Sequence, residues 1–128
     1  MQTAILLIAH GSRIEGANDD LRELAQQLRA TTDYAIVEPC YLELAEPDID
    51  AGAVQCIQRG AGRIILLPFF LSAGLHVQRD LEAARHRLAG AHPGVEFWLA
   101  KPIGRHPKLL EILLDRVRET EANAPRAI

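Results

Sequence analysis

Four apolar runs, each followed by apolar residues at helical spacing, organise most of the sequence. Residues 4–9 contain no polar side chain, and residues 64–70 form the strongest run in the chain. Runs without polar positions are typical of parallel strands covered on both faces. Residues 34–41 and 95–100 are two further strand candidates. We therefore expect four strands.

Between and after these runs, apolar residues recur every three or four positions, as in an amphipathic helix. The first row begins at Leu21, with Asn18 and Asp19 upstream as candidate caps. Pro47 fits the first position of the second helix, where no amide hydrogen is needed. The apolar positions of the four expected helices are Leu21, Leu24, Ala25 and Leu28; Ile49, Ala53 and Ile57; Val77, Leu81, Ala84 and Leu88; and Leu110, Leu113, Leu114 and Val117.

The alternation of strand and helix predicts an α/β fold. Right-handed crossovers convert this order into a three-layer structure, a four-stranded parallel sheet in the order 2-1-3-4 flanked by helices. We expect one domain over residues 1–121 and a frayed tail over residues 122–128. Ligands bind such sheets beyond the carboxyl ends of the strands, at the point where the winding direction changes. Here that point lies between the first and third strands.

Two histidines follow the strands on either side of this point. His10 comes directly after the first strand, and His76 follows the third. Glu43 leaves the neighbouring second strand at the same edge of the sheet. Two imidazoles form a metal site or an acid/base pair, and with a carboxylate they suit Fe, Co or Ni. Alternatively, His10 is a solvated residue at a strand exit and Glu43 an exposed loop carboxylate.

Other residues near this edge have a functional and a structural interpretation. Ser12 and Arg13 could hold an anionic group of a ligand, since arginine suits carboxylates. Gly11 and Gly74 either let the backbone approach a bulky ligand or form tight turns. Glu46 either faces the ligand or stabilises the start of the second helix through the helix dipole.

Composition excludes several classes of partner. The chain has 14 basic and 17 acidic residues, a net charge of −3, which gives no electrostatic footprint for nucleic acid. Residues 64–71, the longest apolar stretch, are far short of the ~20 residues that cross a bilayer. The first residues lack the basic start of a secretory signal, so we expect a cytoplasmic location. Cys40 and Cys56 form no C-x-x-C pattern, and we expect two buried thiols.

Four motifs, one after each strand, carry a resemblance to a known family. They are Ile8-Ala-His-Gly-Ser-Arg13, Tyr41-Leu-Glu-Leu-Ala-Glu-Pro47, Pro68-Phe-Phe-Leu-Ser-Ala-Gly-Leu-His76 and Pro102-Ile-Gly-Arg-His-Pro107. In this order they resemble the small CbiX-type class II tetrapyrrole chelatases, a group with sirohydrochlorin cobaltochelatases and ferrochelatases. The resemblance covers nearly the whole chain and implies a chelatase-like fold.

The resemblance also implies an activity and a set of residues. It implies a chelatase, a lyase that inserts Co²⁺, or Fe²⁺ or Ni²⁺, into metal-free sirohydrochlorin in cobalamin or siroheme-type biosynthesis. The metal is then a substrate, and no cofactor is tightly bound. Residues matching His10 and His76 hold the metal, and the one matching His10 also accepts a proton. The residue matching Glu43 handles metal or removes protons, and such proteins pair as homodimers.

The same resemblance assigns the tetrapyrrole contacts, with Arg13 as our candidate for the carboxylates of the substrate. The matching positions are Glu46, Leu71, Ser72, Ala73, Gly74, Leu75 and His76. Ser72 and Ala73 stand where some relatives have an additional histidine, and a histidine-rich insertion is absent from the sequence. The identity of the metal is therefore left open.

Two other function classes compete with catalysis of metal insertion. The same site could bind a metal or tetrapyrrole for delivery, without turnover. His10-Gly11 after the first strand also resembles the start of histidine phosphatases. Those enzymes have an arginine directly before the histidine, where this chain has Ala9, which counts against a phosphatase.

Overall fold

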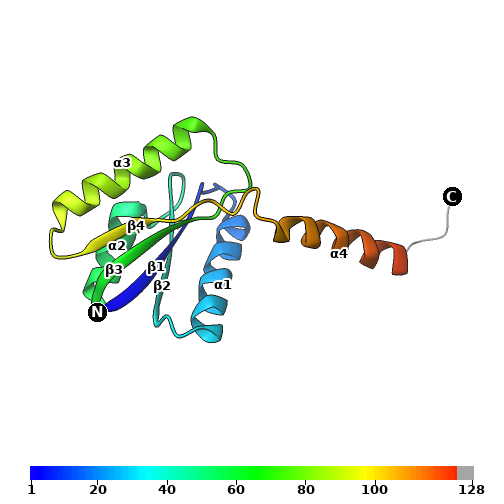
Figure 1. The fold of residues 1–128 in the computed structure, drawn as a ribbon, viewed down its shortest axis with the longest axis horizontal. Helices are drawn as coiled ribbons and strands as arrows, with labels where there is room; N and C mark the ends of the chain where they lie inside the picture. The colour runs from blue at the N-terminus through cyan, green and yellow to red at the C-terminus, as the bar shows by residue number, and fades with distance from the viewer. Residues whose placement is uncertain (124–128) are drawn as a thin grey trace.

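Strands and helices alternate throughout residues 1–123, which are the residues described by the computed structural model. The elements in chain order are β1 (Gln2–Ala9), α1 (Glu15–Thr31), β2 (Ile36–Tyr41), α2 (Ile49–Gln58), β3 (Ala61–Pro68), α3 (Leu75–Ala91), β4 (Glu96–Leu99) and α4 (Lys108–Ala122). Figure 1 shows this arrangement. All eight predicted elements are present. Of the tail predicted over residues 122–128, the last five residues lie outside the described part of the chain.

The four strands form one parallel sheet in the order β2-β1-β3-β4, which confirms the predicted topology. β1 is central, and Ala4 pairs with Ile36 of β2 on one side and Ile64 of β3 on the other. Apolar side chains fill β1 because helices cover it on both faces. The carboxyl ends of β1, β2 and β3 consequently lie along one edge of the sheet.

Two apolar clusters hold the layers together. On one face, α2 and α3 cover the sheet, with Leu6, Ile64 and Leu66 packed against Ala53 of α2 and Leu81 of α3. On the other face, α1 covers the β2-β1 half of the sheet through its buried residues Leu21 and Ala25. Cys40 and Cys56 are both buried in the first cluster as free thiols, as predicted.

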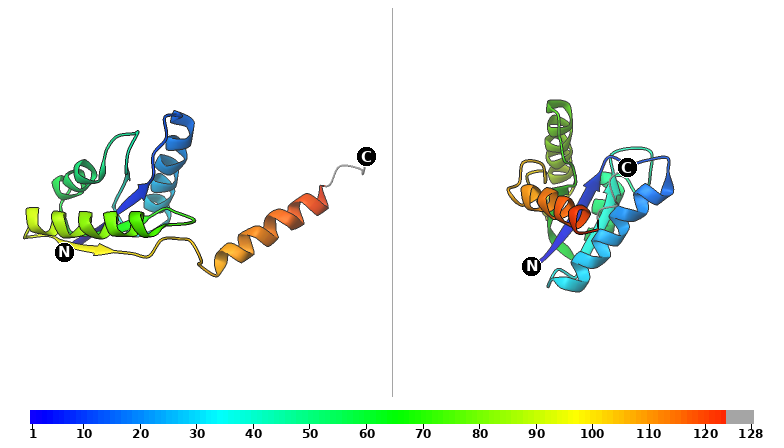
Figure 2. Two further views of the ribbon diagram at one scale, coloured as in Figure 1. Left: turned by 90° about the horizontal axis from the view of Figure 1, so that it is seen from above. Right: turned by 90° about the vertical axis from the view of Figure 1, so that its right-hand side faces the viewer.

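The fourth helix departs from the expected layering. α4 leaves the body of the molecule instead of returning over the sheet (Figures 1 and 2), and none of its residues is buried. Of the four helices in residues 1–123, three therefore cover the sheet. In the part of the chain that the structure describes, every helix is too short or too polar to span a bilayer.

Two of the predicted helix starts were wrong. α1 begins at Glu15, so that Asn18 and Asp19 lie within the helix and do not cap it. α2 begins at Ile49, and its cap is Asp48, whose side chain accepts a hydrogen bond of 2.8 Å from the amide of Ala51. Pro47 thus precedes the helix. In both places the residue that matches a local start signal lies elsewhere, Asn18 within α1 and Pro47 before α2.

Candidate functional site

His10 and Glu43 lie side by side because the pairing of β1 with β2 continues past the ends of both strands. The amide of Leu42 donates to the carbonyl of Ala9 at 2.9 Å, and the amide of Glu43 donates to the carbonyl of His10 at 3.0 Å. The side chains also meet, with Nε2 of His10 2.8 Å from Oε1 of Glu43. Each side chain is 58% exposed. The structure therefore brings these two predicted site residues together, within reach of solvent.

Gly11 permits this close approach of the two loops. Its φ is +99°, and a Cβ at this position would lie 1.8 Å from the carbonyl oxygen of Glu43. Only glycine fits such a position. We expected Gly11 either to let a ligand approach the backbone or to form a tight turn. In the structure the group that approaches Gly11 is the backbone of Glu43. Gly74 differs, since nothing lies within 4 Å of a Cβ placed there, and it serves as the N-terminal boundary of α3.

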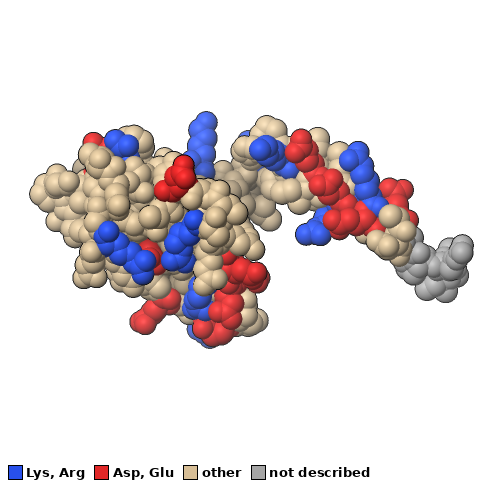
Figure 3. Space-filling model, turned by 90° about the horizontal axis from the view of Figure 1, so that it is seen from below, with Lys and Arg blue, Asp and Glu red and all other residues tan. Residues whose placement is uncertain are grey.

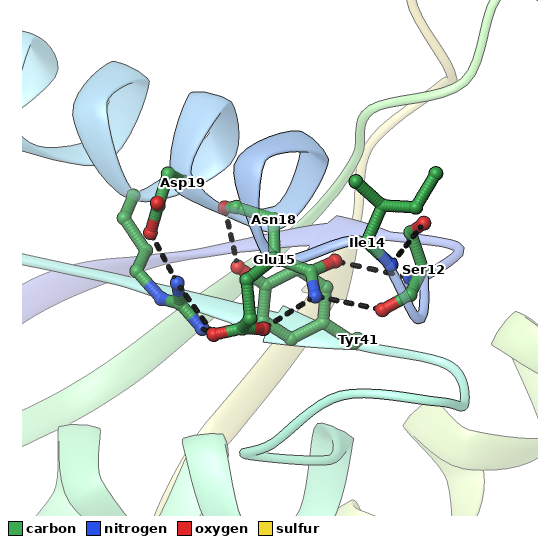
Figure 4. A network of polar contacts seen from close by, with 7 residues as sticks. Ser12, Ile14, Glu15, Asn18, Asp19 and Tyr41 are labelled. Carbon is green, nitrogen blue, oxygen red and sulfur yellow. Dashed lines mark hydrogen bonds and ion pairs between the residues drawn. The ribbon is translucent and has the colours of Figure 1, made fainter.

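A buried polar network fixes the loop that carries His10 (Figure 4). Asn18 is 2% exposed, and its Oδ1 accepts from the amide of Ser12 at 3.0 Å. Its Nδ2 donates to the carbonyl of Ser12 at 2.8 Å and to Oε1 of Glu15 at 2.8 Å. The hydroxyl of Tyr41, at the end of β2, donates to the carbonyl of Asn18 at 2.8 Å. The amide and the carbonyl of Ser12 thus both form hydrogen bonds with the Asn18 side chain, and these bonds position the loop.

Tyr41 keeps its proton in this network. Burial of the ring raises the pKa of the phenol, and the nearby Arg22 guanidinium lowers it in part. Arg22 lies 5.9 Å from the centre of the Tyr41 ring and pairs with Asp19 at 2.5 Å. The hydroxyl therefore remains a donor at neutral pH. The network joins α1, the loop after β1 and the end of β2 into one unit.

The loop after β2 carries Glu43 near its start, and Pro47, near its end, is hydrogen-bonded to Tyr41. The amide of Tyr41 donates to the carbonyl of Pro47 at 2.9 Å, and Leu44 has a φ of 65°. Glu46 is exposed, and Asp48 rather than Glu46 caps the next helix. Glu46 is therefore available to a ligand. Arg13 is also exposed, and it lines neither of the two cavities described below.

His76 is not joined to the His10–Glu43 pair. It is the second residue of α3 and is exposed, as are Leu71 and Leu75, which are 69% and 60% exposed. Among residues 1–123, no three His, Cys, Asp or Glu side chains are grouped closely enough to hold one metal ion. The structure thus brings His10 together with Glu43, whereas His76, the other predicted metal ligand, stands at the start of α3.

Two open cavities lie along the carboxyl edge. His10 and Glu43 line a cavity of about 460 Å³, together with Val77, Asp80 and Arg87 of α3. A larger cavity, about 940 Å³, lies between the segment after β3 and the segment after β4. Leu71, Ser72 and Ala73 line it, as do Lys101, Arg105 and His106. Part of the predicted substrate segment therefore borders a cavity large enough for a drug-sized ligand.

Sequence reasoning missed the basic side of the larger cavity. Lys101 and Arg105 follow the short strand β4, and nothing in their spacing indicates that they line the same cavity as Ser72. The signal that could have been used is Gly104. A Cβ on Gly104 would lie 2.0 Å from the carbonyl oxygen of Leu71, and its amide donates to the carbonyl of Phe70 at 3.0 Å. A glycine between strand and helix thus marked a loop-to-loop contact.

A parallel sheet in the order 2-1-3-4, with a histidine and a carboxylate paired beyond its carboxyl edge beside open cavities, defines a doubly wound α/β protein of the ligand-binding or catalytic type. Within that class, the chain belongs to the CbiX family, whose model matches residues 4–120. The match includes most of β1, the whole of the other three strands and nearly all of α4.

Known proteins agree with this membership. The chain is 36% identical to the chloroplastic sirohydrochlorin ferrochelatase of Arabidopsis thaliana over 89% of its own length and 51% of the relative. The structure of the CbiX protein from Marinobacter aquaeolei VT8 is similar with a TM-score of 0.82 at 32% identity, covering 95% of this chain and 99% of that one. The cobalt complex of the sirohydrochlorin chelatase SirB from Bacillus subtilis subspecies spizizenii gives a TM-score of 0.84 at 28% identity, covering 93% and 51%. The chain spans about half the length of several curated relatives that it matches.

Proposed function

We propose that this protein is a sirohydrochlorin chelatase, which inserts Co²⁺, or Fe²⁺ or Ni²⁺, into the metal-free tetrapyrrole. The observation that carries the proposal is the His10–Glu43 pair, 2.8 Å apart at the carboxyl edge of the sheet and open to a cavity. The names of the relatives support it, because they include ferrochelatases and cobaltochelatases acting on sirohydrochlorin.

The chemistry of metal insertion suits this pair. A divalent ion replaces the two N–H protons of the pyrrole nitrogens, so the site must bind a metal and remove two protons. Imidazole does both near physiological pH, and it accepts a proton when it is not bound to the metal. In our proposal His10 binds the metal and then accepts one proton, and Glu43 assists and passes protons to solvent. The 58% exposure of both side chains supports this exchange with water.

A site that delivers its metal must also release it. Structural metal sites are closed by four ligands, whereas reactive ones keep open positions. We propose His76 as a second ligand that approaches from the start of α3 when metal and tetrapyrrole bind. The His10–Glu43 pair alone is then the resting site, which is consistent with the lack of a three-residue group in residues 1–123.

The tetrapyrrole itself carries many carboxylates and needs positive partners. We propose that it contacts the segment from Leu71 to His76, with Glu46 nearby and Arg13 on the opposite loop. Lys101 and Arg105 line the larger cavity beside Ser72, so we add them as partners for peripheral carboxylates. Arginine and lysine both bind carboxylates through charge-assisted hydrogen bonds.

Three further parts of the proposal concern the state of the protein. We propose that it requires no resident cofactor, because the two protons leave without any change of redox state. We also propose that it acts as a homodimer and in the cytoplasm. The resemblance of the four motifs to small CbiX-type chelatases supports the homodimer.

The experiment follows the absorption spectrum of metal-free sirohydrochlorin with Co²⁺, Fe²⁺ or Ni²⁺. We expect acceleration over the spontaneous rate, and a loss of roughly 100-fold or more in His10→Ala, the usual contribution of a proton-transfer residue. Glu43→Gln and His76→Ala should also lose activity. His86→Ala is the matched control, because His86 is exposed on α3 and lines neither cavity.

The same assay, with metal-free sirohydrochlorin and the metal ions, distinguishes a delivery protein from a chelatase. Stoichiometric binding of metal or tetrapyrrole, without acceleration of insertion, identifies a carrier and not a chelatase. Full activity in both His10→Ala and His76→Ala would contradict the site. Hydrolysis of a phosphomonoester is not expected, since Ala9 precedes His10.

A further inference from the structure

The two cavities at the carboxyl edge flank α3, one on each side of its buried face. α3 packs on the sheet through Leu81, Ala84 and Leu88. The α3 residues that line the smaller cavity are Val77, Asp80, Ala83, Ala84 and Arg87, and those that line the larger one are Gln78 and Leu81. At about 100° per residue, the centres of the two sets lie roughly 120° apart around the helix. The first turns of α3 therefore separate the two cavities.

Carboxylates and an imidazole line the smaller cavity. Glu43 and Asp80 both border it, together with His10. Arg87 lines it as well, but its guanidinium is paired with Asp50 at 3.0 Å, so this positive charge is compensated. Carboxylate oxygen and imidazole nitrogen are both ligands of divalent metals. Of the two substrates in the proposed reaction, this cavity suits the metal ion.

The larger cavity has the opposite character. Lys101, Arg105 and His106 line it, and no aspartate or glutamate of residues 1–123 does. Within the same residues, neither Lys101 nor Arg105 forms an ion pair, whereas Arg59 and Arg63 are both paired with glutamates. A concave surface lined by charges of one sign concentrates the electrostatic potential. This cavity is therefore a positive site in a chain whose net charge is −3.

The backbone before α4 fixes the position of these basic residues. The amide of Gly104 is anchored on the carbonyl of Phe70 at 3.0 Å, and the amide of His106 donates to the carbonyl of Ile103 at 3.1 Å. Between these bonds Arg105 has a φ of 67°, in the left-handed region that arginine rarely adopts. Such backbone strain is found most often at ligand-binding sites. The loop thus holds Arg105 at the cavity instead of relaxing.

His106 adds a hydrogen-bond donor to this cavity. Its Nδ1 accepts a hydrogen bond of 3.1 Å from the amide of Lys108. A neutral imidazole has one donor and one acceptor nitrogen, so a ring that accepts through Nδ1 carries its proton on Nε2. Lysine and arginine side chains have donors and no acceptor. The three side chains therefore offer N–H groups to a ligand, which suits an acceptor such as a carboxylate.

We propose that Lys101, Arg105 and His106 form a carboxylate clamp, which selects tetrapyrroles by the number of carboxylates on their rim. Lysine and arginine bind carboxylates through charge-assisted hydrogen bonds, and Nε2 of His106 supplies a further donor. The macrocycle then lies over the first turn of α3, with rim carboxylates in the larger cavity and its nitrogens towards the smaller one. Charge thus sends each substrate to its own cavity. The inference rests on the proposed function, to which it adds the residues that determine specificity.

Two metal-free porphyrins test this selection without any metal ion. Uroporphyrin carries an acetate and a propionate on every ring, and in coproporphyrin methyl groups replace the acetates. Titration of their fluorescence with the full chain should give a dissociation constant about 10-fold lower for uroporphyrin. Added salt should reduce this preference, because salt screens exposed charges. Equal affinity for the two porphyrins would overturn the clamp.

A charge-matched pair of double variants assigns the preference to the cavity. Lys101→Gln with Arg105→Gln should weaken uroporphyrin binding by about 10-fold or more and coproporphyrin binding by less. The control is Lys108→Gln with Arg118→Gln on α4, since both residues are exposed and line neither cavity. Figure 3 shows α4 standing clear of the body, with acidic and basic side chains along it. Both double variants remove two positive charges, so equal losses in the two would refute the clamp.

Two replacements of His106 test the third member. Asparagine and aspartate both carry an oxygen that can accept from the amide two residues on, so both can keep the bond to Lys108. His106→Asp also places a negative charge at the cavity, and it should bind uroporphyrin about 5-fold more weakly than His106→Asn. Because the clamp residues belong to neither core cluster, all variants should keep the circular dichroism of the parent. Equal affinity of the two His106 variants would remove His106 from the clamp.

Steady-state metal insertion distinguishes the clamp from the proposed activity itself. The Lys101→Gln, Arg105→Gln variant should raise the KM for sirohydrochlorin and leave the KM for Co²⁺ unchanged, whereas His10→Ala should lower kcat. A parent chain that prefers uroporphyrin through Lys101 and Arg105 but does not insert metal would support the clamp and contradict the chelatase. A parent chain that inserts metal, with one KM for sirohydrochlorin in the clamp and control variants, would support the chelatase and refute the clamp.

Discussion

Replacement of Gly11 by alanine tests how the loops after β1 and β2 are held together. The added Cβ would lie 1.8 Å from the carbonyl oxygen of Glu43, and ordinary contact begins at 3.4 Å. One backbone must therefore retreat by about 1.6 Å (3.4 − 1.8). A non-glycine residue at positive φ costs about 1–3 kcal/mol, and an overpacked contact costs about 1–3 kcal/mol. The free energy of unfolding should fall by about 2–6 kcal/mol.

Urea denaturation followed by circular dichroism measures this loss. With a slope of about 1–3 kcal/mol per molar urea, a loss of about 2 kcal/mol lowers the midpoint by roughly 0.7–2 M. Gly16→Ala is the matched control, since nothing lies within 4 Å of a Cβ there and α1 already contains the residue. We expect it to be neutral or stabilising by up to about 1 kcal/mol. A midpoint for Gly11→Ala equal to that of the parent would refute the close packing of the two loops.

The remaining predictions concern the supports of the site. Tyr41→Phe removes the donor to the Asn18 carbonyl and should cost about 1–3 kcal/mol in urea denaturation; an unchanged midpoint would count against the network. Asp48→Ala removes the cap of α2 and should cost about 1 kcal/mol, whereas Asp50→Ala, two residues further on, removes only an exposed ion pair with Arg87 and should cost less; equal losses would contradict the capping role. Burial raises the pKa of the Cys56 thiol to about 12 and that of Cys40 further, so neither thiol should react with a disulfide reagent at pH 8 until urea unfolds the chain. Because unfolded thiols release protons from about pH 9.0 and the folded ones retain them, stability should fall as the pH rises above that value; rapid labelling of the native protein would show that the two sites are open.

The topology could be predicted from the sequence because it depends on strong, repeated signals. Uninterrupted apolar residues identify β1 and β3, and the handedness of crossovers leaves few orders for four parallel strands. The proximity of His10 and Glu43 follows from the same reasoning, since parallel strands end at a common edge. Both inferences required only the spacing of apolar residues along the sequence and the parallel orientation of the strands.

Other features depend on contacts between segments that are distant in sequence. Asn18 is a residue type that commonly caps helices, but here its side chain hydrogen-bonds to the backbone of Ser12. Its carbonyl accepts from the hydroxyl of Tyr41, so Asn18 belongs to a buried network between distant segments. Lys101 and Arg105 line the same cavity as Ser72, where Gly104 packs the loop after β4 on the carbonyl of Leu71. The direction of α4, away from the sheet, could not be predicted from the apolar stripe in its sequence. Such a stripe indicates that a helix packs on some surface, but it does not identify the surface.

The contact between Gly104 and Leu71 also has a consequence for motion. A carbonyl oxygen lies where a side chain of residue 104 would stand, and the amide of Gly104 donates a hydrogen bond to the carbonyl of Phe70, so the two loops around the larger cavity cannot separate without breaking backbone contacts. They should open as one unit, so their protected amides should share a single free energy of opening in native-state hydrogen exchange. Any opening of this wall also shifts the base of α4, three residues beyond Arg105. The width of the cavity and the angle of the helix are thus mechanically coupled.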